Sequence, residues 1–222
     1  MDLHKKILAY HGKFVENPHH RYRSWEHCYG FFRQTTPTRI VQERHHAALQ
    51  LGFYLASWGM YRNSFLLQHA YSVHLGVIDC LALPEFASLW DNDIGSKSEH
   101  SELARTILAA VEAVRAAYSP FKPTDTLVTK VLLGTFGCLP ACDRYFIDGF
   151  KKAGFKYAYL NAQFVGRILK FCDANMAELG KEQARIEGIG GVRYPFMKLA
   201  DMYFWQVGFE ASMQSGVTEI AE

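Results

Sequence analysis

The sequence predicts an all-α fold, a single globular domain of about ten helices that spans residues 1–222. At 222 residues the chain is long enough to bury one large core, and no linker-like segment divides it. Apolar residues make up 49% and charged residues 21%, which is typical of globular proteins. Apolar residues recur at helical spacing through most of the chain, whereas no alternating pattern of useful length predicts a strand.

Proline, glycine and capping residues set the expected helix boundaries in the first half of the chain. Asn17-Pro18 stops an amphipathic first helix, and residues 35–38 combine a helix stop with an N-cap candidate. Residues 47–60 are apolar around almost the whole helix circumference, which is typical of a buried central helix. The expected helices cover residues 2–15 and 21–34 and, between 39 and 83, two long helices broken near 59–63.

The second half of the chain contains longer amphipathic segments. Pro84 opens a short helix, and Ser119-Pro120 ends a longer one. Residues 91–96 and the glycine-rich residues 188–191 have the composition of loops. The expected helices cover residues 84–90, 98–118, 124–136, 141–153, 161–179 and 194–213.

Charge and cysteine content bear on partners and location. The net charge is +2, but the first 46 residues carry eight Lys or Arg against four Asp or Glu, which suits a phosphate-facing surface. The N-terminal residues lack the pattern of a secretory signal, and the longest apolar stretch falls short of the roughly 20 residues of a membrane span. The odd number of cysteines, five, favours reduced thiols. We therefore expect a soluble cytoplasmic protein with no membrane partner.

One segment combines a lysine, an apolar helix, a Gly/Pro turn and an aspartate. In residues 128–143, Lys130 precedes an apolar run and Asp143 stands where the next helix begins. This arrangement resembles the helix-hairpin-helix DNA glycosylases and their helical relatives, and it covers about 20 of the 222 residues. The Gly-hydrophobic-Gly hairpin of that family is missing. The chain is also similar in general make-up to phage-defence glycosylases that act on modified cytosine.

The resemblance implies an enzyme that flips a modified base out of double-stranded DNA and cleaves its N-glycosidic bond without a cofactor. A fixed carboxylate stabilises the oxocarbenium character that develops on the sugar, and this is the role implied for Asp143. Lys130 would lower the pKa of the aspartate, contact a phosphate or attack the sugar as an amine. The structural alternative is that Asp143 only caps the following helix and Lys130 is a solvated cation.

Residues 19–29 are rich in aromatic and cationic side chains. An enzyme that flips a base needs an aromatic wall to receive it and polar groups to recognise its edge. The alternative is an aromatic helix packed on the core. The candidate substrate-binding residues are Tyr22, Arg23, Trp25, Glu26 and His27.

Two other functions compete with the glycosylase hypothesis. Arg62 and His69 match the loose Arg-x6-His pattern of HEPN-like helical ribonucleases of defence or toxin systems, whose paired Arg and His act on an RNA phosphate. A non-enzymatic helical interaction protein is the other alternative. It predicts that changes at Asp143 and Lys130 affect only stability.

The remaining polar motifs are incomplete. His45-His46 and Cys138-x3-Cys142 do not complete a four-ligand set, so we expect no metal. Asp201 lies among aromatic residues, where a buried carboxylate needs a partner such as a backbone amide or an arginine. No glycine-rich phosphate loop, nucleophile elbow or dinucleotide fingerprint occurs in the sequence, so nucleotide hydrolysis and hydride transfer have no support.

Overall fold

The computed structural model describes residues 2–90, 100–189, 192–214 and 216, and these residues form helices and no strand. The all-α class that the sequence predicts is confirmed. Three short 3₁₀-helices are η1 (Phe65–Gln68), η2 (Tyr71–His74) and η3 (Pro84–Phe86). The α-helices are α1 (Leu3–Val15), α2 (Arg23–Gln34), α3 (Pro37–Gln42), α4 (Arg44–Ser57), α5 (Leu75–Leu81), α6 (Ala87–Trp90), α7 (His100–Ala117), α8 (Asp125–Gly134), α9 (Arg144–Lys152), α10 (Ala162–Ala174), α11 (Met176–Gly188) and α12 (Phe196–Gln214).

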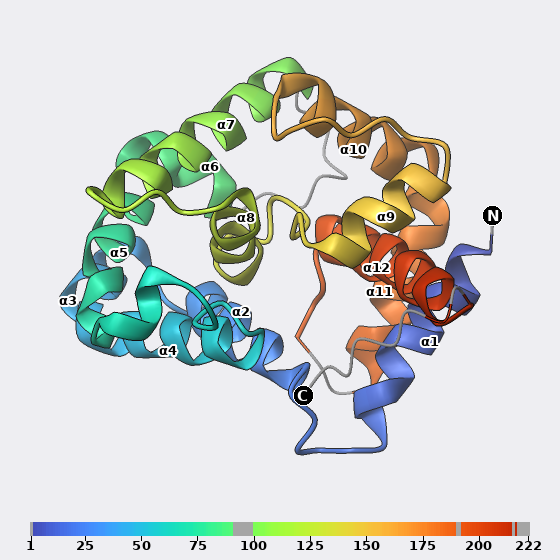
Figure 1. Cartoon of the computed structure of the whole chain (residues 1–222), viewed down its shortest axis with the longest axis horizontal. Coiled ribbons are helices and arrows are strands. Elements are labelled where there is room, and N and C mark those ends of the chain that lie inside the picture. Colours follow the sequence, from blue (N-terminus) through green and yellow to red (C-terminus); the bar gives the residue numbers. More distant parts are fainter. Residues whose placement is uncertain (1, 91–99, 190–191, 215, 217–222) are drawn as a thin grey trace.

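The helices form one globular fold with two groups of neighbours (Figure 1). Helices α2 to α8 lie on one side, where α4 contacts both α2 and α8. Helices α9 to α12 and α1 lie on the other, and α12 packs along α9 and α1. The chain crosses from the first group to the second through residues 135–143, between α8 and α9. The Lys130–Asp143 segment therefore lies at the junction of the two groups.

Several boundaries differ from those that the sequence predicts, and each difference has a local cause. The helix expected over 161–179 is broken at Asn175, whose side-chain amide donates to the Phe171 carbonyl and ends α10. The break expected near 59–63 is present, since Gly59 and Asn63 adopt positive φ angles. The second long helix expected after it is replaced by η1, η2 and α5, because the backbone is extended at Ser64, His69 and Ala70. The loop predicted at 91–96 and part of that at 188–191 lie outside the described residues.

Two glycines allow the backbones of α9 and α12 to touch. A Cβ atom added at Gly149 would lie 1.8 Å from the Phe204 carbonyl oxygen, and one at Gly208 would lie 2.0 Å from the Tyr145 carbonyl oxygen. Real Cβ contacts are never this short, so only glycine fits at either position. This crossing holds α9, and the aspartate at its N-terminus, against α12.

Two features bear on the expected location: the state of the cysteines and the length of the apolar helices. The five cysteines are all unpaired, and four of them are buried. Among the described residues, no single helix has the length and apolar composition needed to cross a membrane, although a pair bent by 74° (Tyr71–Leu81 and Pro84–Trp90) meets that criterion by length and composition.

His74 lies at the centre of a buried hydrogen-bonded group. Its Nε2 and Nδ1 atoms are each 2.8 Å from a tyrosine hydroxyl, those of Tyr61 and Tyr118 respectively. The side chain is fully buried, and desolvation lowers the pKa of His74 from 6.5 to about 4. The imidazole is therefore neutral at pH 7, and protonating it in the folded state is costly.

We expect this histidine to make the protein less stable in mild acid. Between pH 6.5 and 4 the unfolded chain binds a proton at His74 that the folded chain does not, so the free energy of unfolding falls as the pH falls through this window. The contribution is about 3 kcal/mol when complete. Urea unfolding at pH 7 and pH 4.5 measures it, with His74→Gln as the comparison. A variant that loses as much stability between the two pH values as the wild type would rule this explanation out.

Candidate functional site

Lys130 and Asp143 meet at the junction between α8 and α9. The Lys130 ammonium Nζ lies 3.1 Å from Asp143 Oδ2, and Asp143 Oδ1 accepts the Phe146 backbone N–H at 3.0 Å. The Lys130 side chain is 4% exposed and that of Asp143 18% exposed. Asp143 therefore caps α9 and also pairs with a buried lysine, so the alternative of Lys130 as a solvated cation is wrong.

An aromatic ring lies against the lysine. Lys130 Nζ lies 4.6 Å from the centre of the Trp58 ring, and Tyr22 stacks on the same indole with ring centres 4.9 Å apart. The ring face stabilises the cation where water is excluded. Burial raises the pKa of Tyr22 to about 12, so its phenol is neutral at pH 7. The arrangement is a lysine–carboxylate pair beside a stacked aromatic wall.

The wall also carries an unused hydrogen-bond donor. The indole Nε1 of Trp58 is buried and has no hydrogen-bond partner among the described residues. Buried polar groups of proteins are nearly always paired, so an unpaired donor next to charged side chains marks a place where a ligand or water can accept a hydrogen bond. The Arg21 guanidinium lies 5.7 Å from the centre of the same ring.

A second lysine–aspartate pair lies behind the first. Lys198 Nζ is 2.8 Å from Asp201 Oδ2, and both side chains are at most 5% exposed. The Lys198 ammonium also lies 5.0 Å from the Trp25 ring centre and 5.8 Å from that of Trp58. Desolvation lowers the pKa of Lys198, and the positive charge of Lys130 lowers it further, while Asp201 opposes the shift. The two pairs therefore share the Trp58 ring and interact electrostatically.

Three hydrogen bonds hold the segment that ends at Asp143. Asp201 Oδ1 accepts the Ala141 N–H at 3.0 Å, so α12 fixes the residue two before the candidate catalytic aspartate. Thr129 Oγ1 accepts the Cys142 N–H, and Thr126 Oγ1 donates to the Cys142 carbonyl, both at 2.8 Å. The position of Asp143 is therefore set by α8 on one side and α12 on the other.

The residues predicted to bind substrate are divided by the fold. Tyr22 stacks on Trp58, and Trp25 lies beside Lys198, although Trp25 is buried and its Nε1 donates to the Leu133 carbonyl. Glu26 instead accepts hydrogen bonds from Arg23, at 3.2 Å, and from the Tyr194 hydroxyl, at 2.8 Å. His27 is exposed.

Sequence reasoning missed Trp58 and Lys198 as members of this cluster. The available signal was Lys198-x2-Asp201, an oppositely charged pair at i,i+3 in an otherwise apolar helix. The requirement that Asp201 find a buried partner is met by the Ala141 amide together with Lys198. Trp58 follows α4 directly and carries no local signal.

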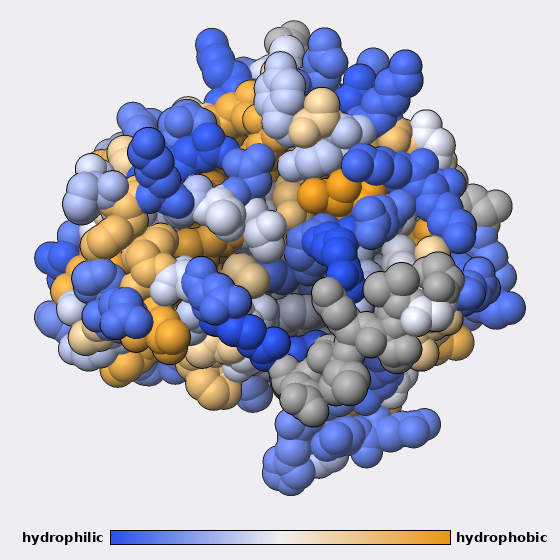
Figure 2. Space-filling model, in the orientation of Figure 1, coloured by the Kyte–Doolittle hydropathy of each residue, from blue (hydrophilic) through white to orange (hydrophobic). Residues whose placement is uncertain are grey.

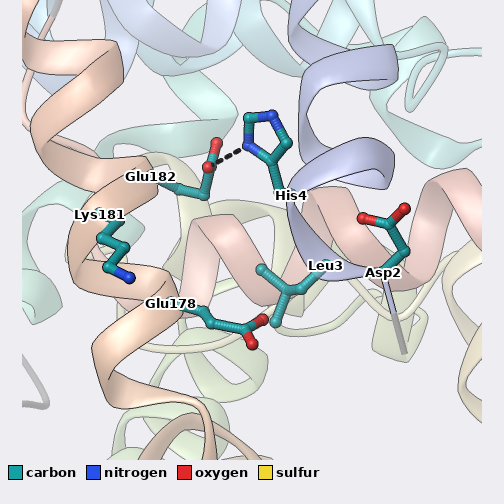
Figure 3. A pocket seen from close by; sticks show the side chains of 6 residues that line it. All are labelled: Asp2, Leu3, His4, Glu178, Lys181 and Glu182. Carbon is teal, nitrogen blue, oxygen red and sulfur yellow. Dashed lines mark hydrogen bonds and ion pairs between the residues drawn. The ribbon is translucent and has the colours of Figure 1, made fainter.

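The other motifs lie elsewhere. Arg62 and His69 lie on either side of η1, and the His69 ring contacts Phe121 with ring centres 4.7 Å apart. Within the part of the chain that the structure describes, no group of three or more His, Cys, Asp or Glu is arranged to hold a metal ion. Figure 3 shows a cavity of about 420 Å³ between α1 and α11, where His4 contacts Glu182. None of the predicted site residues lines it.

Figure 2 shows hydrophilic and apolar side chains mixed over the middle of the viewed face, and a larger apolar area over α3 to α5. No protein-family model, curated protein or solved structure matches this chain at a significant level. The class is therefore defined by the fold and the site: an all-α protein with two coupled, buried lysine–aspartate pairs against an aromatic wall.

Proposed function

We propose that the chain is a DNA N-glycosylase that takes a modified base out of the duplex and cleaves its bond to the sugar. The contact that carries this proposal is the 3.1 Å pair of Lys130 and Asp143 beside Trp58 and Tyr22. A carboxylate held by a helix N-terminus and a buried cation is a preorganised anion, which is what a developing oxocarbenium ion requires. The half-buried Trp58 indole is the aromatic group that would meet an extruded base.

The chemistry assigns separate tasks to the two residues. As the N-glycosidic bond breaks, its electron pair leaves with the base nitrogen and positive charge develops on the sugar, opposite the Asp143 carboxylate. A water molecule adds to C1′ and gives its proton to this carboxylate. Lys130 holds the carboxylate in place and sets a positive charge 3.1 Å from its Oδ2. The unpaired indole N–H of Trp58 is available to an acceptor on the base edge or to the water.

The substrate and setting are proposed on narrower grounds. The resemblance of residues 128–143 to the glycosylases points to double-stranded DNA, and the similarity to phage-defence glycosylases points to modified cytosine in phage DNA as the target. Hydrolysis as written uses no cofactor. A cytoplasmic location fits the five unpaired cysteines, which are stable as thiols in a reducing compartment.

The proposal is tested by abasic-site formation on genomic DNA from unmodified and hypermodified phages, after heat and alkali. We expect abasic sites from the wild type only on modified DNA, and a rate at least about 100-fold lower for Asp143→Asn. Asparagine is a good N-cap, so this variant keeps the cap of α9 while losing the charge. Asp148→Asn, on the exposed side of the same helix, is the matched control and should retain the wild-type rate.

Two results would count against the proposal. The first is a wild-type protein that leaves every DNA intact at a folded concentration verified by circular dichroism. The second is an Asp143→Asn variant as active as Asp148→Asn. RNA degradation that disappears in His69→Ala would instead support the ribonuclease alternative.

A further inference from the structure

Two cavities in the described part of the chain are lined by cations, and neither is lined by a described Asp or Glu. The first, of about 390 Å³, includes Arg62 and Lys122 among its lining residues. The second, of about 550 Å³, includes Lys151, Lys156 and Arg167. The cavity in Figure 3 is different, because three carboxylates line it together with one lysine and one histidine. The first two cavities therefore favour an anionic ligand, whereas the third does not.

The first cavity adjoins the lysine–aspartate site. Gly59, one of its lining residues, directly follows Trp58, whose ring lies over Lys130. Thr126, another lining residue, lies one helical turn before Lys130 and donates to the carbonyl of Cys142, next to Asp143. A group bound by Arg62 and Lys122 would therefore be a near neighbour of a nucleotide held at Asp143.

The second cavity lies at the opposite end of α9. Asp143 caps the N-terminus of this helix, and Lys151 is in its last turn, about 12 Å further along the helix axis. Figure 1 shows α9 running from the middle of the viewed face towards the segment that follows it. The Arg167 guanidinium donates to the Lys156 carbonyl at 2.7 Å, which holds it at this cavity. Tyr159, also in the lining, is 63% exposed and offers a ring for stacking.

We propose that these two cavities bind backbone phosphates of DNA on the two sides of the nucleotide that lies at Asp143. A DNA strand advances about 3.4 Å per nucleotide along the duplex axis, so 12 Å corresponds to roughly three or four nucleotides. Side chains that contact phosphates fix the register of a protein on the duplex without recognising sequence. The location of the nucleotide between the cavities rests on the proposed function, whereas phosphate binding by the cavities does not.

The experiment measures binding of an unmodified 25-base-pair duplex by fluorescence anisotropy at several salt concentrations, with the full chain. One double variant is Arg62→Gln with Lys122→Gln, and the other is Lys151→Gln with Lys156→Gln. Each phosphate contact contributes about 0.9 to the slope of log affinity against log salt, so each double variant should lower that slope by about 1.8. Affinity at 0.1 M salt should fall at least about tenfold. Lys181→Gln, in the carboxylate-lined cavity, is the control and should bind as the wild type does.

The two proposals fail in distinguishable ways. If either double variant is folded and binds with the wild-type affinity and salt slope, the two-sided surface is wrong, even where Asp143→Asn still abolishes base excision. If the wild type excises no base but both double variants lose affinity and slope, phosphate binding stands and only the catalytic proposal fails. Loss of affinity with an unchanged salt slope would also contradict the proposed phosphate-binding surface, since it would mean that no phosphate contact was removed.

Discussion

Gly149→Ala is expected to destabilise the fold by more than about 4 kcal/mol, a large part of the stability of an ordinary domain. The added Cβ atom would lie 1.8 Å from the Phe204 carbonyl oxygen and 2.8 Å from the Gly208 backbone nitrogen. Both are backbone atoms inside α12, so no side chain can rotate away and the two helices must separate. Separation opens the aromatic packing between Phe146, Phe150 and Phe204.

The measurement is urea unfolding followed by circular dichroism, with Gly166→Ala as the control. Gly166 lies inside α10, and a Cβ atom added there meets nothing within 4 Å. Because alanine is a better helix former than glycine, Gly166→Ala should be neutral or stabilise the protein by up to about 1 kcal/mol. A Gly149→Ala protein as stable as Gly166→Ala would show that α9 and α12 do not touch at this crossing.

The same crossing matters for the candidate site. Asp143 stands at the start of α9, and its segment is held by Asp201 on α12. Any shift of α9 along α12 moves the carboxylate relative to Lys130 and Trp58. A partly folded Gly149→Ala protein should therefore lose base excision more than it loses helix content. A displacement of the Asp143 carboxylate by about 1 Å is sufficient to lower the rate strongly.

The second large effect is expected at the buried pair Lys198–Asp201. Lys198→Met removes the cation and leaves the buried Asp201 carboxylate with the Ala141 amide as its one hydrogen-bond partner among the described residues. Breaking one side of a buried pair leaves an uncompensated charge, so the free energy of unfolding should fall by about 3–5 kcal/mol at pH 7. Methionine has a similar length and volume, so little of the loss comes from packing.

A double substitution separates charge from packing. Lys198→Met with Asp201→Asn removes both charges and keeps an acceptor for the Ala141 N–H, so we expect it to be more stable than Lys198→Met alone. Lys170→Met, at an exposed position of α10, controls for loss of a lysine and should change stability by less than about 0.5 kcal/mol. If the double variant is no more stable than Lys198→Met, the unpaired charge of Asp201 is not the cause of the lost stability.

Much of the local structure follows from the sequence. The amphipathic spacing of residues 2–15 predicts α1, and Pro84 predicts the start of η3, each within a residue or two. Asp143 was expected where a helix begins, and it caps α9, since a short carboxylate satisfies the free N–H groups of a first turn. Such signals involve residues within one or two helical turns of each other, so they can be recognised in the sequence without the tertiary structure. The break near 59–63 was expected, but the one at Asn175 was missed, because asparagine is compatible with both a helix and its end.

The sequence by itself therefore determined the all-α class, most of the helices and the lysine and aspartate that meet at the α8–α9 junction. Only the tertiary structure decided what surrounds them. Trp58 and Lys198 are 140 positions apart in the chain, yet the Lys198 ammonium lies 5.8 Å from the indole. They come from segments that are apolar around most of their circumference, so periodicity gives no preferred face and no partner. Contacts of this kind are set by how whole helices pack, and in α9 and α12 that packing depends on two glycines.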